Sequence, residues 1–99
     1  MSNPSPVPER IREARMAKGL SQKALGISAG IDEFSASPRI NQYERGKHTP
    51  DFAMLKQLAK ALDVPTAYFY ADDDWLAEAI CSLEKLSETE KRNLFPPNI

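Results

Sequence analysis

Proline and glycine residues divide this chain into short segments, and this division limits most strongly what it can fold into. Pro8, Pro38 and Pro50 each occupy a position where a helix can begin, because proline is tolerated in the first helical turn and damaging later. Gly19 and Gly30 stand where helices typically end. Apolar residues recur at helical spacing between these positions, and no segment is convincing as a strand. The sequence therefore predicts an all-α protein.

Local start and stop signals give the expected helices their bounds. Residues 1–7 are rich in Pro and Ser and bury little apolar surface, so a disordered tail is expected there. Ser37 is the expected cap of the third helix, with Pro38 in its first turn. Ser87 and Glu90 form a capping-box pattern at the start of the last helix. Helices are expected over 8–19, 21–30, 37–45, 49–63, 72–86 and 87–95, with one helical turn at 67–70.

Residue content excludes several classes of function. No apolar run is long enough to span a membrane, and Cys81 alone cannot form an internal disulfide, so the cytoplasm is the expected compartment. With one histidine and no Cys/His cluster, we expect no metal, no cofactor and no enzyme activity. Residues 1–50 hold eight Lys/Arg and five Asp/Glu, a balance of +3, while residues 51–99 hold five and nine, a balance of −4. A basic first half permits a nucleic-acid-binding face.

The segment SPRINQYERG is unusually polar for a helix of a small domain. If Ile40 lies at the centre of its inner face, Tyr43 and Glu44 lie beside it at i+3 and i+4. Arginine can pair with two atoms of guanine, and asparagine or glutamine with two atoms of adenine. This helix and the short one before it match the helix-turn-helix geometry, in which the second helix reads the major groove. The residues expected to point outward are Pro38, Asn41, Gln42 and Arg45, with Arg39 on the flank.

Residues 10–69 resemble the helix-turn-helix domain of the lambdoid phage repressor, Cro and Xre-type bacterial regulators. The resemblance is carried by the stretches RIREARMAKGLSQKAL, AGI, INQYERGKHTP and LKQLAKALDVPTAYF. It implies a five-helix repressor-like DNA-binding domain over residues 8–71, followed by a C-terminal helical extension of one or two helices over 72–99. It also implies a structural ion pair between Arg15 and Glu44, which would join the first helix to the third.

The expected DNA contacts lie on the second and third helices. The resemblance implies that Gln22 contacts a phosphate and that the start of the third helix, with a residue one turn later, reads bases. Helix N-termini and nearby cations also hold phosphate. The expected base-reading residues are Ser37, Pro38, Arg39, Asn41 and Gln42. The expected phosphate contacts are Ser21, Gln22, Lys23, Arg45 and Lys47.

The segment IDEFSAS departs from the resemblance, because it is longer than the turn usual in that family. Ser35 is therefore an alternative cap for the third helix. Asp32 and Glu33 must point away from DNA, since carboxylates repel phosphates, and Phe34 is expected to anchor the segment by packing into the core. Gly26 weakens the second helix by about 1 kcal/mol relative to alanine, a cost that close packing of another helix would explain.

The C-terminal extension carries an apolar stripe of its own, on a helix that starts in the acidic run Asp72–Asp74. Part of the stripe is expected to cover the end of the fourth helix, and the rest to form a two-fold dimer interface. Ala77, Glu78 and Cys81 are expected on the solvent side. The dimer-interface candidates are Trp75, Leu76, Ala79, Ile80, Leu83, Leu86, Leu94 and Phe95.

Together these features predict a sequence-specific transcriptional regulator, bacterial or phage-encoded and associated with the nucleoid. The leading hypothesis is a repressor that binds an inverted-repeat operator as a homodimer. The alternative is an antitoxin-like or adaptor module for protein interaction, in which DNA binding is secondary. Double-stranded DNA and a second copy of the chain are the expected partners; a protein partner is left open, and no membrane contact is expected.

Overall fold

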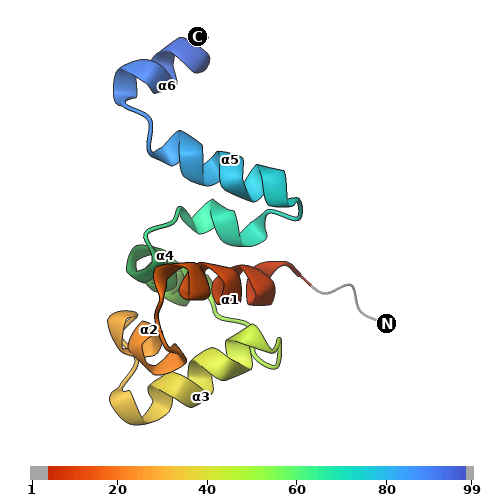
Figure 1. Ribbon diagram of the computed structural model, residues 1–99, viewed down its shortest axis with the longest axis vertical. Helices are drawn as coiled ribbons and strands as arrows, with labels where there is room; N and C mark the ends of the chain where they lie inside the picture. Colours follow the sequence, from red (N-terminus) through yellow and green to blue (C-terminus); the bar gives the residue numbers. More distant parts are fainter. Residues whose placement is uncertain (1–4, 98–99) are drawn as a thin grey trace.

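The computed structural model describes residues 5–97, which form helices and no strands (Figure 1). Four helices and a 3-10 helix, η1, make up the body, and two further helices follow. This architecture confirms the all-α fold with extra helices after the repressor-like domain. The elements are α1 (Val7–Lys18), α2 (Gln22–Ser28), α3 (Glu33–Glu44), α4 (Phe52–Leu62), η1 (Thr66–Tyr70), α5 (Asp74–Glu84) and α6 (Glu88–Leu94).

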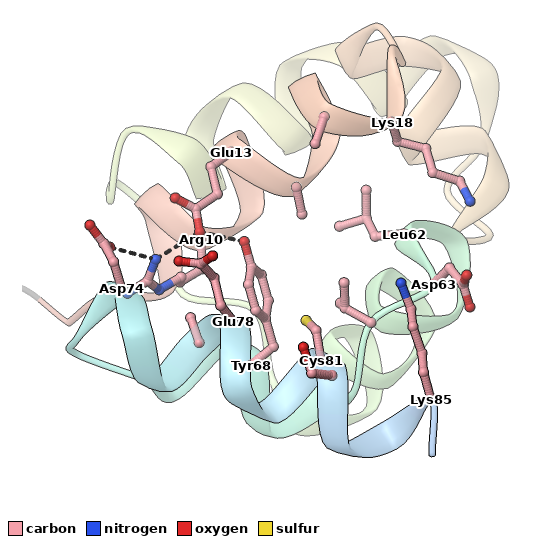
Figure 2. Close-up of a pocket in the computed structure, with 15 residues that line it drawn as sticks. Arg10, Glu13, Lys18, Leu62, Asp63, Tyr68, Asp74, Glu78, Cys81 and Lys85 are labelled. Carbon is pink, nitrogen blue, oxygen red and sulfur yellow. Dashed lines mark hydrogen bonds and ion pairs between the residues drawn. The ribbon is translucent and has the colours of Figure 1, made fainter. Parts of the chain in front are cut away.

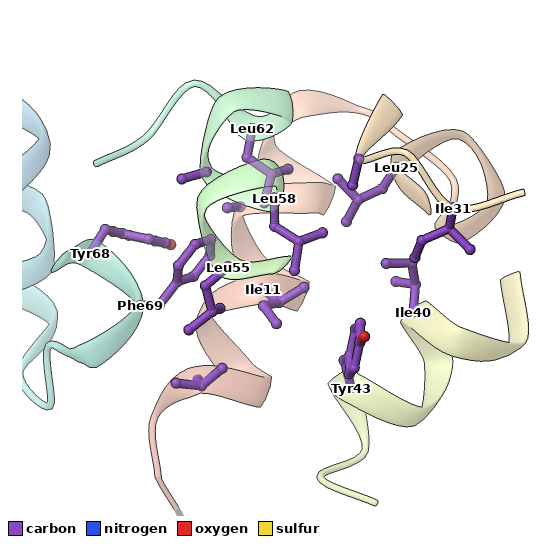
Figure 3. Close-up of a cluster of buried hydrophobic side chains, with 14 of the residues drawn as sticks. Ile11, Leu25, Ile31, Ile40, Tyr43, Leu55, Leu58, Leu62, Tyr68 and Phe69 are labelled. Atoms are coloured by element: carbon purple, nitrogen blue, oxygen red, sulfur yellow. The ribbon is translucent and has the colours of Figure 1, made fainter. Parts of the chain in front are cut away.

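One hydrophobic core lies between α1, α2, α3, α4 and η1 (Figure 3). Each of these helices turns the face on which its apolar residues recur toward a common centre. From α3, Ala36, Ile40 and Tyr43 enter the core, so the opposite face of that helix is left to solvent. The largest fully buried side chains are Ile11, Leu25, Ile40, Leu55, Leu58 and Phe69.

Helix α1 begins at Val7, which is only 4% exposed. The predicted disorder of residues 1–7 is therefore wrong for Val7, while residues 1–4 lie outside the described residues. Val7 shares a face with Ile11 and Ala14, and burial of its side chain offsets the entropy lost when this turn is ordered. The helix ends before Gly19, whose φ of 72° is the left-handed conformation expected at that position.

Helix α3 begins at Glu33, well before the predicted start at Ser37. Its cap is Asp32, which accepts a hydrogen bond from the Ser35 N–H at 3.0 Å, so neither Ser37 nor Ser35 is the cap. The segment IDEFSAS, expected to be a loop, thus supplies the first turns of the helix, and Pro38 lies inside it. The prediction that Phe34 packs into the core is also wrong: its side chain is 88% exposed, because a helical Phe34 points away from the core side of α3.

Helix α4 begins at Phe52 with Asp51 as its cap, rather than at Thr49 and Pro50. The Asp51 carboxylate accepts a hydrogen bond from the Met54 N–H at 2.8 Å. Phe52 is 62% exposed because it lies in the first turn, before the helix reaches the core. The buried positions of this helix are Leu55, Leu58, Ala59 and Leu62.

Helix α5 turns a different face toward the body from the one predicted. Ala77 is 1% exposed and Cys81 is half-buried against the core, so their predicted place on the solvent side is wrong. The reason is that α5 packs along η1 instead of covering the end of α4. Trp75 and Leu76 are left 69% and 38% exposed.

Helix α6 lies at the end of the molecule opposite α3 (Figure 1). Its predicted capping box is formed: the Glu90 N–H donates to Ser87 at 3.1 Å and the Ser87 N–H donates to the Glu90 carboxylate at 2.9 Å. The bonds from Ser87 lower the pKa of Glu90. No residue of α6 is buried. Within residues 5–97, no helix combines the length and apolar character needed to cross a membrane.

Candidate nucleic-acid interface

Helices α2 and α3 approach each other closely at Gly26. A Cβ atom built on Gly26 would lie 2.6 Å from the Cβ of Ala36, so only glycine fits this contact. The turn between the helices is closed by a hydrogen bond from the Ile31 N–H to the Gly26 carbonyl at 2.9 Å, and Gly30 adopts a φ of 96°. The close packing expected at Gly26 is therefore present, and it joins α2 and α3 into one rigid helix-turn-helix unit.

The solvent side of α3 forms what we call the outer face, made of Phe34, Pro38, Asn41, Gln42 and Arg45. At about 100° per residue these five positions fall within an arc of about 100°, roughly opposite the three buried positions of the helix. In Figure 1, α3 is the outermost helix at its end of the molecule. Its outer face is therefore available to a large partner.

The structure brings the predicted base-reading residues to this part of α3. Pro38 and Arg39 are exposed, while Ser37, Asn41 and Gln42 are half-buried. By the same helical projection, Ser37 and Arg39 lie on opposite flanks of the outer face. The five residues therefore occupy the outer face and both of its flanks. Their contacts with bases stay a prediction.

Gln22, at the start of α2, contacts α3 directly. Its Nε2 atom donates hydrogen bonds to Asn41 Oδ1 at 3.3 Å and to Glu44 Oε1 at 3.1 Å. These two bonds use both hydrogens of the amide and orient the Asn41 side chain, whose own NH₂ group stays free to donate. A phosphate contact by Gln22, which stays a prediction, requires the amide to give up one of these bonds.

Arg15 and Glu44 form a two-bond ion pair between α1 and α3. Arg15 Nε lies 2.6 Å and Nη2 lies 3.1 Å from the Glu44 carboxylate oxygens, and Nη1 donates to the Leu20 carbonyl at 2.9 Å. The side chains are 15% and 3% exposed, so water screens the pair weakly. The hydrogen bond to Glu44 outweighs desolvation and raises the pKa of Arg15. The pair holds the C-terminal end of α3 against α1.

The predicted phosphate contacts lie at the start of α2, at the C-terminal end of α3 and just after it. Ser21 caps α2 by accepting a hydrogen bond from the Ala24 N–H at 3.0 Å, which leaves its hydroxyl hydrogen free to donate. Lys23, Arg45 and Lys47 are exposed, and none of them is in an ion pair within the described part of the chain. Free cations beside a polar helix provide the sequence-independent attraction that phosphate binding needs.

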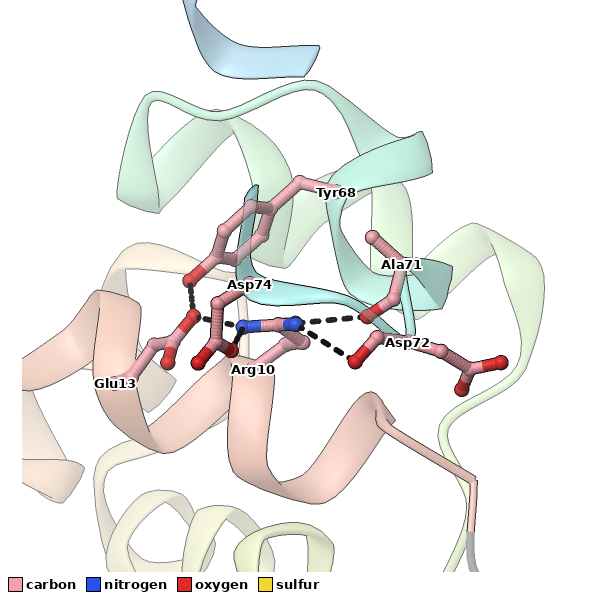
Figure 4. A network of polar contacts seen from close by, with 6 residues as sticks. All are labelled: Arg10, Glu13, Tyr68, Ala71, Asp72 and Asp74. Carbon is pink, nitrogen blue, oxygen red and sulfur yellow. Dashed lines mark hydrogen bonds and ion pairs between the residues drawn. The ribbon is translucent and has the colours of Figure 1, made fainter. Parts of the chain in front are cut away.

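A buried arginine that the sequence analysis missed joins α1 to the C-terminal extension (Figure 4). Arg10 is 4% exposed and donates to the Ala71 carbonyl at 3.0 Å, to Glu13 at 2.7 Å and to Asp74 at 3.0 Å. Burial opposes its charge, but the bonds to these carboxylates prevail and raise the pKa of Arg10. Arg10 lies three residues after Val7 and therefore on the same, buried side of α1. This spacing is visible in the sequence and could have identified Arg10 as a buried residue. The acidic run thus supplies Asp74 as an ion-pair partner, in addition to the predicted helix start.

A groove of about 790 Å³ lies between α1, the end of α4 and α5 (Figure 2). Its lining mixes acids, bases and apolar residues, among them Glu13, Lys18, Leu62, Cys81 and Lys85. Burial raises the pKa of the Cys81 thiol, which keeps it protonated and weakly nucleophilic. Within residues 5–97, no three His, Cys, Asp or Glu side chains are grouped so that they could hold a metal ion.

A family model described as helix-turn-helix matches residues 11–69. An uncharacterized transcriptional regulator in the ATPase CF(0) region of Rhodospirillum rubrum is 36% identical over 66 residues, which cover 67% of this chain and 57% of that protein. The uncharacterized HTH-type transcriptional regulator y4aM of Sinorhizobium fredii is 33% identical over 66 residues, covering 67% of this chain and 43% of that protein. The chain thus spans about half the length of the curated relatives that it matches.

A crystal structure described as transcriptional regulator BswR resembles the whole arrangement, with a TM-score of 0.80 and 46% sequence identity. The match covers 89% of this chain and 87% of that one, so it must include part of the C-terminal extension. The similar proteins are described as regulators of transcription, a class distinct from enzymes.

Proposed function

Because this chain belongs to the Xre/Cro-type helix-turn-helix family, we propose that it is a sequence-specific, double-stranded DNA-binding transcriptional regulator. The observation that carries the proposal is the outer face of α3, which is open to solvent and largely polar. The opposite face is held in the core by Ala36, Ile40 and Tyr43. A helix held from one side can enter the major groove with the other.

Each polar group of this surface has a base that suits its chemistry. The guanidinium of Arg39 can donate to O6 and N7 of guanine, and the amide of Gln42 can pair with adenine. Asn41 accepts from Gln22, and its free NH₂ group can donate to adenine N7. Ser37 and Pro38 would contact neighbouring base edges. Positioning on the backbone would fall to Ser21, Gln22, Lys23, Arg45 and Lys47.

Repression by competition is the mechanism that we propose for this regulator. A protein of this size, bound to its operator, would exclude polymerase or a second regulator from the same stretch of duplex. Occupancy of the operator by the helix-turn-helix body would be enough for this effect.

We further propose that two copies bind an inverted repeat through their C-terminal extensions. The apolar candidates outside the core are exposed: Trp75 is 69%, Leu94 60% and Phe95 64% exposed. The molecule measures 47 × 33 × 24 Å, and its extension lies at the end opposite α3 (Figure 1). Two copies placed side by side along the 33 Å dimension would separate their α3 helices by a distance close to the ~34 Å between half-sites one helical turn apart. An end-to-end pair could not present both α3 helices to one side of a duplex.

Selection of bound sequences from a random duplex pool, followed by affinity measurements on the selected operator, tests DNA reading. Arg39→Ala and Gln42→Ala should each cost about 1–3 kcal/mol and relax the preference at one or two base positions. Lys47→Ala should weaken binding equally on all sequences and make its salt dependence shallower. Lys60→Ala, which removes an exposed lysine from α4, is the matched control. If Arg39→Ala and Gln42→Ala lower affinity uniformly, with base preference unchanged, the assignment of the reading face is wrong.

Sedimentation velocity at high micromolar concentration tests the dimer. The parent protein should sediment as a dimer, and a Trp75→Ala, Leu76→Ala double variant should sediment as a monomer with an unchanged helical CD spectrum. That variant should bind a palindromic operator far more weakly, because each half-site would then be occupied alone. Phe52→Ala, which removes an exposed ring from the body, is the control. A parent protein that is monomeric at this concentration would refute dimerisation through the extension.

A further inference from the structure

Phe34 is the most exposed large apolar side chain among residues 5–97, at 88%. It occupies the first turn of α3, immediately after Glu33. Its exposure does not follow from a lack of ordered surroundings, because the Asp32 cap fixes this turn through the Ser35 N–H at 3.0 Å. The turn that carries the ring is therefore ordered, and covering an exposed ring with a partner is favourable.

The ring continues the outer face of α3 by one turn. Phe34, Pro38, Asn41 and Arg45 recur at i, i+4, i+7 and i+11, so they form one stripe along the helix. Glu33 lies about 100° around the helix from Phe34, and the Asp32 carboxylate accepts the capping bond. The two acidic residues are therefore off this stripe, and the ring can approach DNA without bringing either carboxylate to its front.

We propose that Phe34 is a specificity-determining residue that contacts the C5-methyl group of thymine in the major groove. This assignment rests on the proposed function and names part of its target. The thymine methyl is the apolar group among the base-edge features of the major groove, and a phenyl ring has no hydrogen bond to offer the other bases. The N-terminal residues of a reading helix are the ones that contact base edges, and Phe34 lies in that turn.

The surroundings of the ring favour DNA over a protein partner. A protein-docking patch is a contiguous apolar surface of several hundred Å². On the outer face of α3 the other apolar residue is Pro38, and the remaining positions are Asn41, Gln42 and Arg45. A single ring followed along the helix by a small apolar residue and then by hydrogen-bonding side chains matches a base edge that carries a methyl group beside polar atoms.

The test replaces the thymines of the selected operator with deoxyuridine, one at a time, which removes only the methyl group. Dissociation constants are measured for the full-length parent, Phe34→Ala and the control Phe52→Ala. At one or two positions, deoxyuridine should weaken the parent about fourfold, the equivalent of one buried methyl-sized group. Phe34→Ala should bind the thymine operator about five- to tenfold more weakly than the parent and lose nothing further at those positions. Phe52→Ala should keep the full thymine dependence.

Each other outcome overturns the assignment in a distinct way. If the deoxyuridine penalties are the same in Phe34→Ala and the parent, or absent from the parent, the ring contacts no thymine methyl. If Phe34→Ala binds DNA like the parent but loses self-association in sedimentation, the ring is a protein contact. Phe34→Ala should melt like the parent, since the side chain is 88% exposed, and a large loss of stability would mean a structural role instead. Failure of the proposed function itself is separate, because the parent would then select no operator at all.

Discussion

Replacing Glu44 with alanine should destabilise the free protein strongly, before any DNA is added. Glu44 is 3% exposed and accepts three hydrogen bonds, two from Arg15 at 2.6 and 3.1 Å and one from Gln22 at 3.1 Å. In Glu44→Ala, the Arg15 guanidinium keeps only its bond to the Leu20 carbonyl at 2.9 Å. The Arg15 side chain is 15% exposed, so its charge stays largely buried. An uncompensated charge in such a place costs about 3–5 kcal/mol.

We expect the lower end of that range, because the Leu20 carbonyl and partial exposure of Arg15 retain some solvation. For a domain of this size each kcal/mol lowers the melting temperature by about 4–8 °C, so about 3 kcal/mol corresponds to a fall of about 12–24 °C. Thermal melts followed by far-UV CD measure it. Arg39→Ala, which removes an exposed arginine from α3, should melt like the parent and serves as the control.

A double variant separates the ion pair from other effects of the Glu44 substitution. If the loss arises from an unpaired arginine, Arg15→Met combined with Glu44→Leu should be clearly more stable than Glu44→Ala, because neither charge is then left buried. A Glu44→Ala protein that melts within about 2 °C of the parent would refute the reasoning, since Arg15 would then have to be solvated without its partner.

Three further substitutions test other contacts. Gly26→Ala should destabilise the protein by about 1–3 kcal/mol in urea titrations, because its Cβ would lie 2.6 Å from that of Ala36, and Ala36→Gly in the same chain should restore part of the loss. Arg10→Met should cost only about 2 kcal/mol, since its partner Asp74 is 88% exposed and regains water, and hydrogen exchange should quicken at the α5 amides. Burial, and then the hydrogen bond that its hydroxyl donates to Glu13, raise the pKa of Tyr68 above its usual 10.0. The stability that the protonated hydroxyl contributes is therefore fully present below pH 10 and is lost as the pH rises further. Tyr68→Phe should therefore flatten the alkaline loss of stability above pH 10 in urea titrations; an unchanged slope there would contradict this cause.

The helical class, most of the core and several helix ends could be predicted from the sequence. Apolar residues that recur at helical spacing form one face of a helix, and that face is buried whichever neighbour the helix packs against. The buried residues Ile11, Leu25, Leu55 and Leu58 follow this rule. Ser21 and Ser87 cap their helices because a cap needs only its own side chain and the backbone three residues on. These signals are local, so they hold regardless of how the helices are arranged.

The start of α3 could not be decided locally, because Asp32 and Ser37 are both good caps. The tertiary contact between Ala36 and Gly26 decides it: Ala36 is fully buried against α2 only if residue 36 is already helical, which excludes a start at Ser37. The exposure of Phe34 follows from that choice, because helical geometry then turns residue 34 away from the core. The burial of Ala77 was likewise decided by where η1 and α5 pack. A sequence pattern identifies a face that needs covering, but only the position of the neighbouring helix determines which face is covered.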